Sequence, residues 1–299
     1  MIQITRTLVS GFLMGTADLI PGVSGGTIAL VLGIYERLVN SIREGSSALG
    51  SILKADVPGF KEHLRRVEWL FLVPLLAGIL TAVVSLASFL DHQLEENPTI
   101  LAGLFFGLVV GSVVIAWRLL REPVGLHFVI AFAVAAVLFL LLGIGEDSVV
   151  QDPSLLAYFG AGALAICAMI LPGISGSLIL LLIGMYAPVL AAVNERDFVV
   201  VGIFLLGAII GLGLFSQVLH WALHRHHDPI LAGLIGLMAG SLRVLWPWPE
   251  GVESSGLSAP GDDWVSVVVA AVIGFLVVFV IARLAEPQDD RISQPLTAN

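Results

Sequence analysis

The stretch PGVSGGT, residues 21–27, interrupts one apolar run of this chain, and PGISGS, residues 172–177, interrupts another. Proline has no backbone N–H and glycine tolerates conformations closed to other residues, so each stretch predicts a break in a helix. If the flanking runs cross a membrane, such a break is tolerated only against protein or beside a water-filled cavity. The surroundings of the two stretches therefore decide the fold.

The composition is that of a polytopic membrane protein. Of the 299 residues, 58% are hydrophobic and 12% are charged, about half the charged share of an ordinary soluble domain. Several apolar runs approach the roughly 20 residues that span a bilayer as a helix. We expect ten apolar segments, at approximately residues 8–20, 26–42, 67–90, 98–120, 124–145, 154–171, 177–193, 198–223, 229–246 and 264–284.

The chain also resembles itself. Residues 11–42 align with residues 162–193 without a gap, and 11 of the 32 positions are identical, among them the P-G-x-S-G residues of both stretches. ILAGLFFGLVVGS (100–112) matches ILAGLIGLMAGS (230–241) with one gap. These ordered matches indicate an internal duplication with five apolar segments in each half. Because five is odd, the second half must enter the membrane from the opposite side, as in the inverted repeats of secondary transporters.

The distribution of cations predicts the orientation. With the N-terminus in the cytoplasm, 12 of the 14 Lys and Arg residues fall on the inner side, and only Arg196 and Arg243 fall outside. The opposite orientation would violate the positive-inside rule. We therefore expect both termini in the cytoplasm, and acidic outer loops that contain Asp91, Glu95, Glu96, Glu146, Asp147, Asp152, Glu250, Glu253, Asp262 and Asp263.

The predicted fold is an all-α membrane protein of two inverted repeats, residues 1–150 and 151–285, followed by a disordered cytoplasmic tail, 286–299. Each repeat is expected to open with a broken or re-entrant helical hairpin, at 8–42 and at 154–193, and to continue with three spans. Residues 43–66 form the long polar stretch, expected to be an amphipathic cytoplasmic segment at the membrane surface. The two hairpins would meet near the middle of the membrane.

Two opposed breaks of this kind suit an anion. Free N–H groups and the positive end of the dipole at a helix N-terminus attract negative charge, and serine or threonine caps such helices. The candidate binding residues in the two loops are Gly22, Ser24, Gly25, Gly26, Thr27, Gly173, Ser175, Gly176 and Ser177. The alternative is that these small residues only allow close helix packing.

Charged residues in apolar surroundings are further candidates. Asp18 precedes the first break, and an intramembrane carboxylate either couples protons or ions, or is a buried acid held by loop amides or paired with an arginine. Glu36 is a second coupling candidate, although an interfacial pair with Arg37 explains it equally well. Arg243 and Arg118 could bind phosphate, since guanidinium matches phosphate bidentately. Ion pairing of Arg243, or anchoring of Arg118 at the inner surface, are the alternatives.

No pattern in the sequence calls for a catalytic residue, a metal or a cofactor. HRHHD at 224–228 has no matching Cys or carboxylate cluster, so we expect titratable residues at the membrane surface rather than metal ligands. The single cysteine, Cys167, excludes an internal disulfide and is expected to pack as a small apolar residue. A transporter is therefore favoured over an enzyme.

The motif G-x-A-D-x-I-P-G-V-S-G-G-T, residues 15–27, with G-I-Y-E at 33–36, resembles the family known as domain of unknown function 368, whose members are described as polyprenyl-phosphate translocases. PGISGS and GSLRVLWP (240–247) match its later motifs. The resemblance covers nearly the whole chain. It implies a bacterial cytoplasmic-membrane protein that returns undecaprenyl phosphate from the outer to the inner leaflet during cell-envelope synthesis.

The resulting hypothesis is a lipid-phosphate flippase in which Arg243 captures the head group and the two loops hold it. Undecaprenyl phosphate and membrane lipids are the expected partners, and no nucleic acid is expected. A homo-oligomer and coupling to protons or sodium are compatible with the sequence. The alternatives are a channel or exchanger for a small inorganic anion, a membrane lipid phosphatase, or a scaffold.

Overall fold

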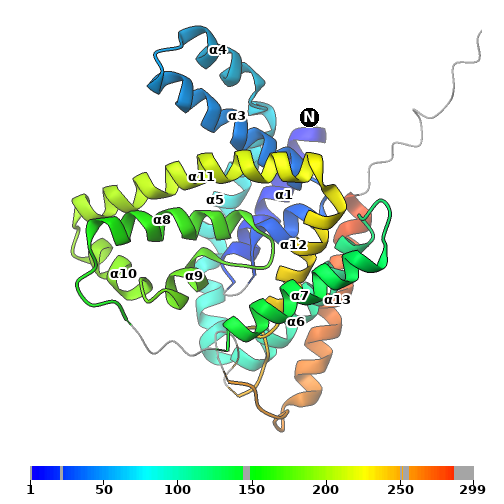
Figure 1. Cartoon of the computed structure of the whole chain (residues 1–299). Helices are drawn as coiled ribbons and strands as arrows, with labels where there is room; N and C mark the ends of the chain where they lie inside the picture. Colours follow the sequence, from blue (N-terminus) through cyan, green and yellow to red (C-terminus); the bar gives the residue numbers. More distant parts are fainter. Residues whose placement is uncertain (1, 21–22, 144–148, 250, 252–255, 286–299) are drawn as a thin grey trace, which may run out of the picture.

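The structure, a computed structural model, describes all residues except 1, 21–22, 144–148, 250, 252–255 and 286–299 (Figure 1). Every regular element in that part of the chain is a helix. In chain order these are α1 (Ile2–Asp18), α2 (Gly25–Val31), α3 (Tyr35–Leu53), α4 (Val57–Arg66), α5 (Trp69–Glu96), α6 (Pro98–Trp117), α7 (Gly125–Leu141), α8 (Leu155–Ile170), α9 (Gly176–Leu182), α10 (Tyr186–Asn194), α11 (Phe198–Arg225), α12 (His227–Ser241) and α13 (Trp264–Ala285).

Length and composition identify candidate membrane-crossing helices. Helices α5, α6, α11 and α13 are long and apolar enough to span a bilayer, and the bent pair of α9 and α10 is a fifth candidate. With 28 residues, α5 is about 42 Å long, which exceeds the roughly 30 Å hydrocarbon core. The prediction of an all-α, multi-pass membrane protein is confirmed at this level.

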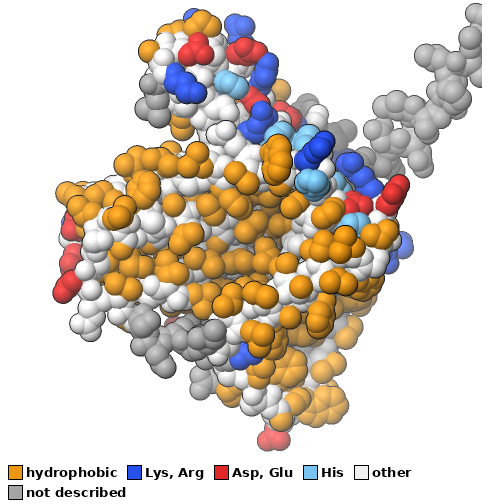
Figure 2. Space-filling view, in the orientation of Figure 1, with side chains coloured by type: hydrophobic (Ala, Val, Ile, Leu, Met, Phe, Trp, Pro, Cys, Tyr) orange, Lys and Arg blue, Asp and Glu red, His pale blue; other side chains and the backbone are white. Residues whose placement is uncertain are grey.

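The surface separates into apolar and charged regions. Apolar side chains cover the face shown in Figure 2 over α7, α8 and α11, and charged side chains gather at the α3–α4 hairpin and the α11–α12 turn. Val84 on α5 is 86% exposed and Phe198 on α11 is 79% exposed. Apolar exposure on this scale is a liability in water, but a surface that faces lipid requires it.

Both predicted breaks are present. Helix α1 ends at Asp18 and α2 begins at Gly25, while α8 ends at Ile170 and α9 begins at Gly176. Each break is followed by a helix of 7 residues, α2 or α9. Pro21 and Gly22 lie outside the described residues.

The segments expected at 26–42 and 177–193 are each two helices rather than one. The additional breaks come at Gly33 (φ 68°) and Gly184 (φ 69°), which occupy aligned positions and adopt the left-handed conformation that favours glycine. The axes of α9 and α10 differ by 113°. Helix α3 runs on to Leu53, beyond the expected end at residue 42, and forms with α4 a hairpin that projects from the rest of the molecule (Figure 1).

Close glycine contacts pair α1 with α5 and α8 with α11. A Cβ added to Gly11 would lie 2.0 Å from the Leu75 carbonyl oxygen, and one added to its aligned partner Gly162 would lie 2.1 Å from that of Phe204. Because only glycine permits such approach, both helix pairs pack backbone to backbone. Aligned positions in the two halves thus make matching contacts.

The remaining helices interlock the halves. Helix α6 packs mainly on α13, and α12 packs mainly on α7. A Cβ on Gly107 of α6 would lie 1.8 Å from the Ala271 carbonyl oxygen, and one on Gly236 of α12 would lie 2.5 Å from that of Ala131. The last helix of each predicted half therefore packs against the other half, and α2 is left at the centre with all its residues buried.

Candidate functional site

The two broken stretches meet at the centre of the molecule. The backbone N–H of Gly173 donates to Thr27 Oγ1 at 2.9 Å, and the Thr27 side chain has no exposed surface. Gly173 itself has φ 85°, and a Cβ there would lie 2.5 Å from the Met238 Cα on α12. This contact joins the start of α2 to the loop before α9, at a distance of 146 residues along the chain.

Ser24 makes the second connection. Its hydroxyl accepts the Gly26 N–H at 3.1 Å, as an N-cap of α2 should, and lies 3.2 Å from the carbonyl oxygen of Leu171 and 3.3 Å from that of Met169. Gly26 of the first stretch lies against the chain just before the second, since a Cβ on Gly26 would be 2.7 Å from the Ile170 carbonyl oxygen. We call these contacts of Ser24, Gly26 and Thr27 with residues 169–173 the central joint.

The contacts of the central joint use the hydroxyl groups of Ser24 and Thr27, which the sequence predicts to bind an anion. Ser24 is 2% exposed and is fully engaged with backbone groups, so in this conformation neither it nor Thr27 faces open space. Ser175 caps α9 by accepting the Leu178 N–H at 3.1 Å, and its hydroxyl lies 3.1 Å from that of Ser177. Ser175 and Ser177 are only half-buried and are the more accessible pair.

Asp18 lies over the start of α2. Its Oδ1 accepts the Gly25 N–H at 2.6 Å, and a Cβ on Gly25 would lie 2.6 Å from Oδ2. At the aligned position in the second half, Met169 lies over Gly176, whose added Cβ would be 2.8 Å from Met169 Cγ. A carboxylate thus fills the N-terminus of α2 where a thioether lies at α9, so the two breaks are similar in shape but differ in charge.

The two candidate arginines lie apart from the central joint. Arg243 follows α12, with its guanidinium carbon 4.8 Å from the ring centre of Phe139 on α7 and its Nη2 beside Gly143. Arg118 ends α6 and is exposed, with its guanidinium carbon 5.6 Å from the Phe279 ring on α13. Neither arginine contacts Ser24 or Thr27 among the interactions of the described residues.

Glu36 does not pair with Arg37. Arg37 pairs with Glu68, which directly precedes α5, whereas Glu36 Oε1 lies 3.2 Å from His227 Nε2 at the start of α12. His227 Nδ1 is also 2.7 Å from Asp228, which accepts the N–H groups of Glu122 and Arg121. These bonds, led by that from Glu122, lower the pKa of Asp228 from 3.8 to about 2. The alternative of a Glu36–Arg37 pair is therefore wrong, and Glu36 links α3 to α12 instead.

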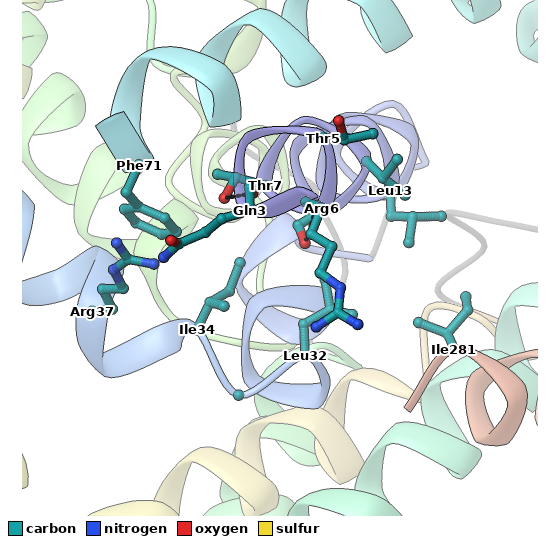
Figure 3. Close-up of a pocket in the computed structure, with 13 residues that line it drawn as sticks. Gln3, Thr5, Arg6, Thr7, Leu13, Leu32, Ile34, Arg37, Phe71 and Ile281 are labelled. Atoms are coloured by element: carbon teal, nitrogen blue, oxygen red, sulfur yellow. Dashed lines mark hydrogen bonds between the residues drawn. The ribbon is translucent and has the colours of Figure 1, made fainter. Parts of the chain in front are cut away.

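Two adjoining cavities lie beside these charges. A cavity of about 580 Å³ between α1, α3, α5 and α13 is lined by Arg6 and Arg37 (Figure 3). A second, of about 370 Å³, shares Gly33 and Arg37 with it and includes the side chain of Tyr35, whose buried hydroxyl has no hydrogen-bond partner among the described residues. The sequence places Arg6 and Arg37 among the inner-side cations and offers Arg37 as a partner for Glu36, but nothing in their spacing shows that Arg6 and Arg37 line one cavity.

Comparisons with known proteins identify the family of this chain. A family model described as undecaprenyl phosphate translocase-like matches residues 14–261, which include both breaks and Arg243. The chain belongs to this family. A polyprenyl-phosphate transporter of Vibrio cholerae serotype O1 is 43% identical to the chain over 263 residues, covering 85% of this chain and 82% of the relative.

A second relative is less similar to the chain. A polyprenyl-phosphate transporter of Staphylococcus aureus is 31% identical over 293 residues, covering 93% of this chain and 95% of the relative. No solved structure matches the chain. The predicted family resemblance is confirmed, and among the described residues no group of three or more His, Cys, Asp or Glu residues could hold a metal ion.

Proposed function

We propose that the chain moves undecaprenyl phosphate from the outer to the inner leaflet of the bacterial cytoplasmic membrane, so that the carrier lipid can be reused in envelope synthesis. The observation that carries this proposal is the central joint, where two sequence-related broken helices from opposite halves meet through buried hydroxyls. The two relatives also support the proposal, because both are named polyprenyl-phosphate transporters.

The proposal includes the inverted orientation of the halves. Helix α1 pairs with α5 and α8 with α11 through aligned glycines, so a rotation that relates the halves would preserve these pairs. Arg6, Arg37 and Arg121 line the two adjoining cavities, and we call the end of the molecule that holds these cavities the basic end. By the positive-inside rule, the basic end would face the cytoplasm. Both chain termini would then be cytoplasmic, and Arg243 would face the outer side.

Transport would follow from opening of the central joint. Arg243 would first bind the phosphate, because a guanidinium forms two parallel hydrogen bonds with it. Rocking of one half against the other would separate Ser24 and Thr27 from residues 169–173 and free their hydroxyls for the phosphate. The nearby amides of Gly25, Gly26, Gly173 and Gly176, with the hydroxyls of Ser175 and Ser177, would complete the polar path.

The proposal requires no covalent step, since the lipid phosphate leaves in the form in which it arrived. Asp18 is the proposed coupling residue because its carboxylate accepts the Gly25 N–H between Ser24 and Gly26 of the central joint, so a change of its charge would alter this contact. Protonation of Asp18 would weaken that contact and favour opening. Glu36 would act at the basic end through His227.

Proteoliposomes provide the test. Leaflet exchange of labelled undecaprenyl phosphate would be followed beside chloride flux, for the wild type, for Arg243→Gln and for the control Arg196→Gln, the other cation of the outer set. We expect exchange by the wild type, at least tenfold slower exchange by Arg243→Gln, little change in Arg196→Gln, and no chloride flux. Chloride flux without lipid exchange would refute the proposal and make the central joint part of an inorganic-anion path.

A further inference from the structure

The larger cavity at the basic end combines charge with an apolar wall. Arg6 and Ser10 of α1 and Arg37 of α3 contribute polar groups, while Leu13, Leu32 and Ile281 contribute apolar ones (Figure 3). Its volume of about 580 Å³ lies within the range of about 300–1,000 Å³ that is typical of ligand pockets. A ligand that fits both parts must have an anionic end and an apolar end.

The two arginines of this cavity are held differently. The Arg37 Nε donates to Glu68 Oε2 at 2.6 Å, and its guanidinium carbon lies 4.2 Å from the centre of the Phe71 ring, so this side chain is fixed before any ligand arrives. Arg6 forms no ion pair with any of the described residues, and its guanidinium points toward Leu32 in Figure 3. One positive charge in the cavity is therefore balanced and the other is available.

The apolar side of the cavity lies between helices that do not pack together closely. Helix α1 packs mainly on α5, and α13 packs mainly on α6. The cavity lies between them, lined by α1 on one side and by Ile281 of α13 on the other. Val9 of α1, which also lines it, is 49% exposed. In a membrane this exposed side would face lipid, and a hydrocarbon chain could leave the cavity there without crossing a polar region.

We propose that this cavity binds the phosphate monoester head of a polyprenyl lipid at the basic end, with Arg6 as its main ligand and Arg37 as a fixed second cation. The inference rests on the proposed function and names the site from which the lipid leaves. It differs from the path through Arg243 and the central joint, because Arg6 and Arg37 belong to neither. The tail lies between α1 and α13.

The chemistry favours a phosphate monoester over a zwitterionic lipid head. Arginine binds phosphate through two parallel hydrogen bonds, and such charge-assisted bonds gain strength where water is restricted. A doubly charged monoester gains from both guanidinium groups, whereas a choline or ethanolamine head would bring a second cation into a cavity that already has a net positive charge. Inorganic phosphate has the same headgroup chemistry but leaves the apolar wall unused.

Binding by the purified protein is the first test, with undecaprenyl phosphate, undecaprenol and inorganic phosphate as separate probes. Arg6→Gln should weaken undecaprenyl phosphate binding about tenfold or more, since it removes a charged hydrogen-bond donor. Arg65→Gln, which removes an exposed cation of α4 outside the cavity, should change binding less than twofold. Unchanged affinity in Arg6→Gln would overturn the proposal, and so would inorganic phosphate binding as tightly with the same dependence on Arg6.

Charge rescue is the second test and separates this site from the proposed function. In a Cys167→Ala background, which must still exchange lipid, Arg6→Cys should slow exchange at least fivefold. Treatment with 2-aminoethyl methanethiosulfonate, which adds an ammonium group at residue 6, should restore it, and the neutral methyl reagent should not. Equal effects of the two reagents, or full exchange by untreated Arg6→Cys, would reject the Arg6 site. Absence of exchange in the Cys167→Ala parent and the wild type would instead reject the transport function.

Discussion

Gly26→Ala probes the central joint directly. The new methyl carbon would lie 2.7 Å from the Ile170 carbonyl oxygen, so the two broken stretches must separate by about 0.7 Å to reach an ordinary contact of 3.4 Å. Overpacking of this kind costs about 1–3 kcal/mol. The higher helix propensity of alanine offsets about 1 kcal/mol of that cost, so we expect the free energy of unfolding to fall by up to about 2 kcal/mol.

The matched control for Gly26→Ala has the opposite expected sign. Gly233 lies in α12, and a Cβ there would meet no atom within 4 Å. Gly233→Ala should therefore raise the free energy of unfolding by about 0.5–1 kcal/mol, through helix propensity alone. Denaturant titration of both variants in the same detergent measures the difference. If Gly26→Ala proved as stable as Gly233→Ala, the close contact at the central joint would be refuted.

Three further predictions concern stability. Thr27→Val leaves the buried Gly173 N–H without its acceptor and should lower the free energy of unfolding by about 1–3 kcal/mol. The control Thr81→Val, on the exposed surface of α5, should change it by less than about 0.5 kcal/mol. Equal losses would contradict the Thr27–Gly173 hydrogen bond. Gly33→Ala should cost about 1–2 kcal/mol because φ is 68° there, and Gly33→Asn should cost less in the same titration. The pKa of Asp228 is lowered from 3.8 to about 2 in the folded protein, so the stability that its carboxylate contributes is complete above pH 3.8 and is lost as the pH falls toward 2. The melting temperatures of the wild type and Asp228→Asn should therefore converge over that interval. A constant difference between them would contradict the assignment.

Local sequence patterns were sufficient for the breaks and for the repeat. The P-G-x-S-G residues interrupt helices because of what proline and glycine do to any backbone, so the ends of α1 and α8 follow without knowledge of the fold. Polar composition suggested that residues 43–66 lie outside the membrane, but not that α3 continues without a break to Leu53. The turns at Gly33 and Gly184 were missed because an isolated glycine in an apolar run is compatible with a continuous helix.

The candidate site was predicted less completely. Ser24 and Ser175 cap the short helices as their position before Gly25 and Gly176 suggests, since capping is a local interaction. The use of the Thr27 hydroxyl by Gly173 depends on a contact between distant parts of the chain, and no pattern near Thr27 indicates it. The same is true of Glu36, whose nearest cation in sequence, Arg37, turns instead to Glu68.

Local sequence was enough to predict the class of protein, the two helix breaks and the duplicated motifs, because hydrophobicity, proline, glycine and capping act over a few neighbouring residues. The packing of α6 on α13 and of α12 on α7, the contact between the two breaks, and the shared cavity of Arg6 and Arg37 became visible in the folded chain. These features depend on which helix surfaces pack together, and that choice is made by the shape and close contacts of the whole chain rather than by any short stretch of it.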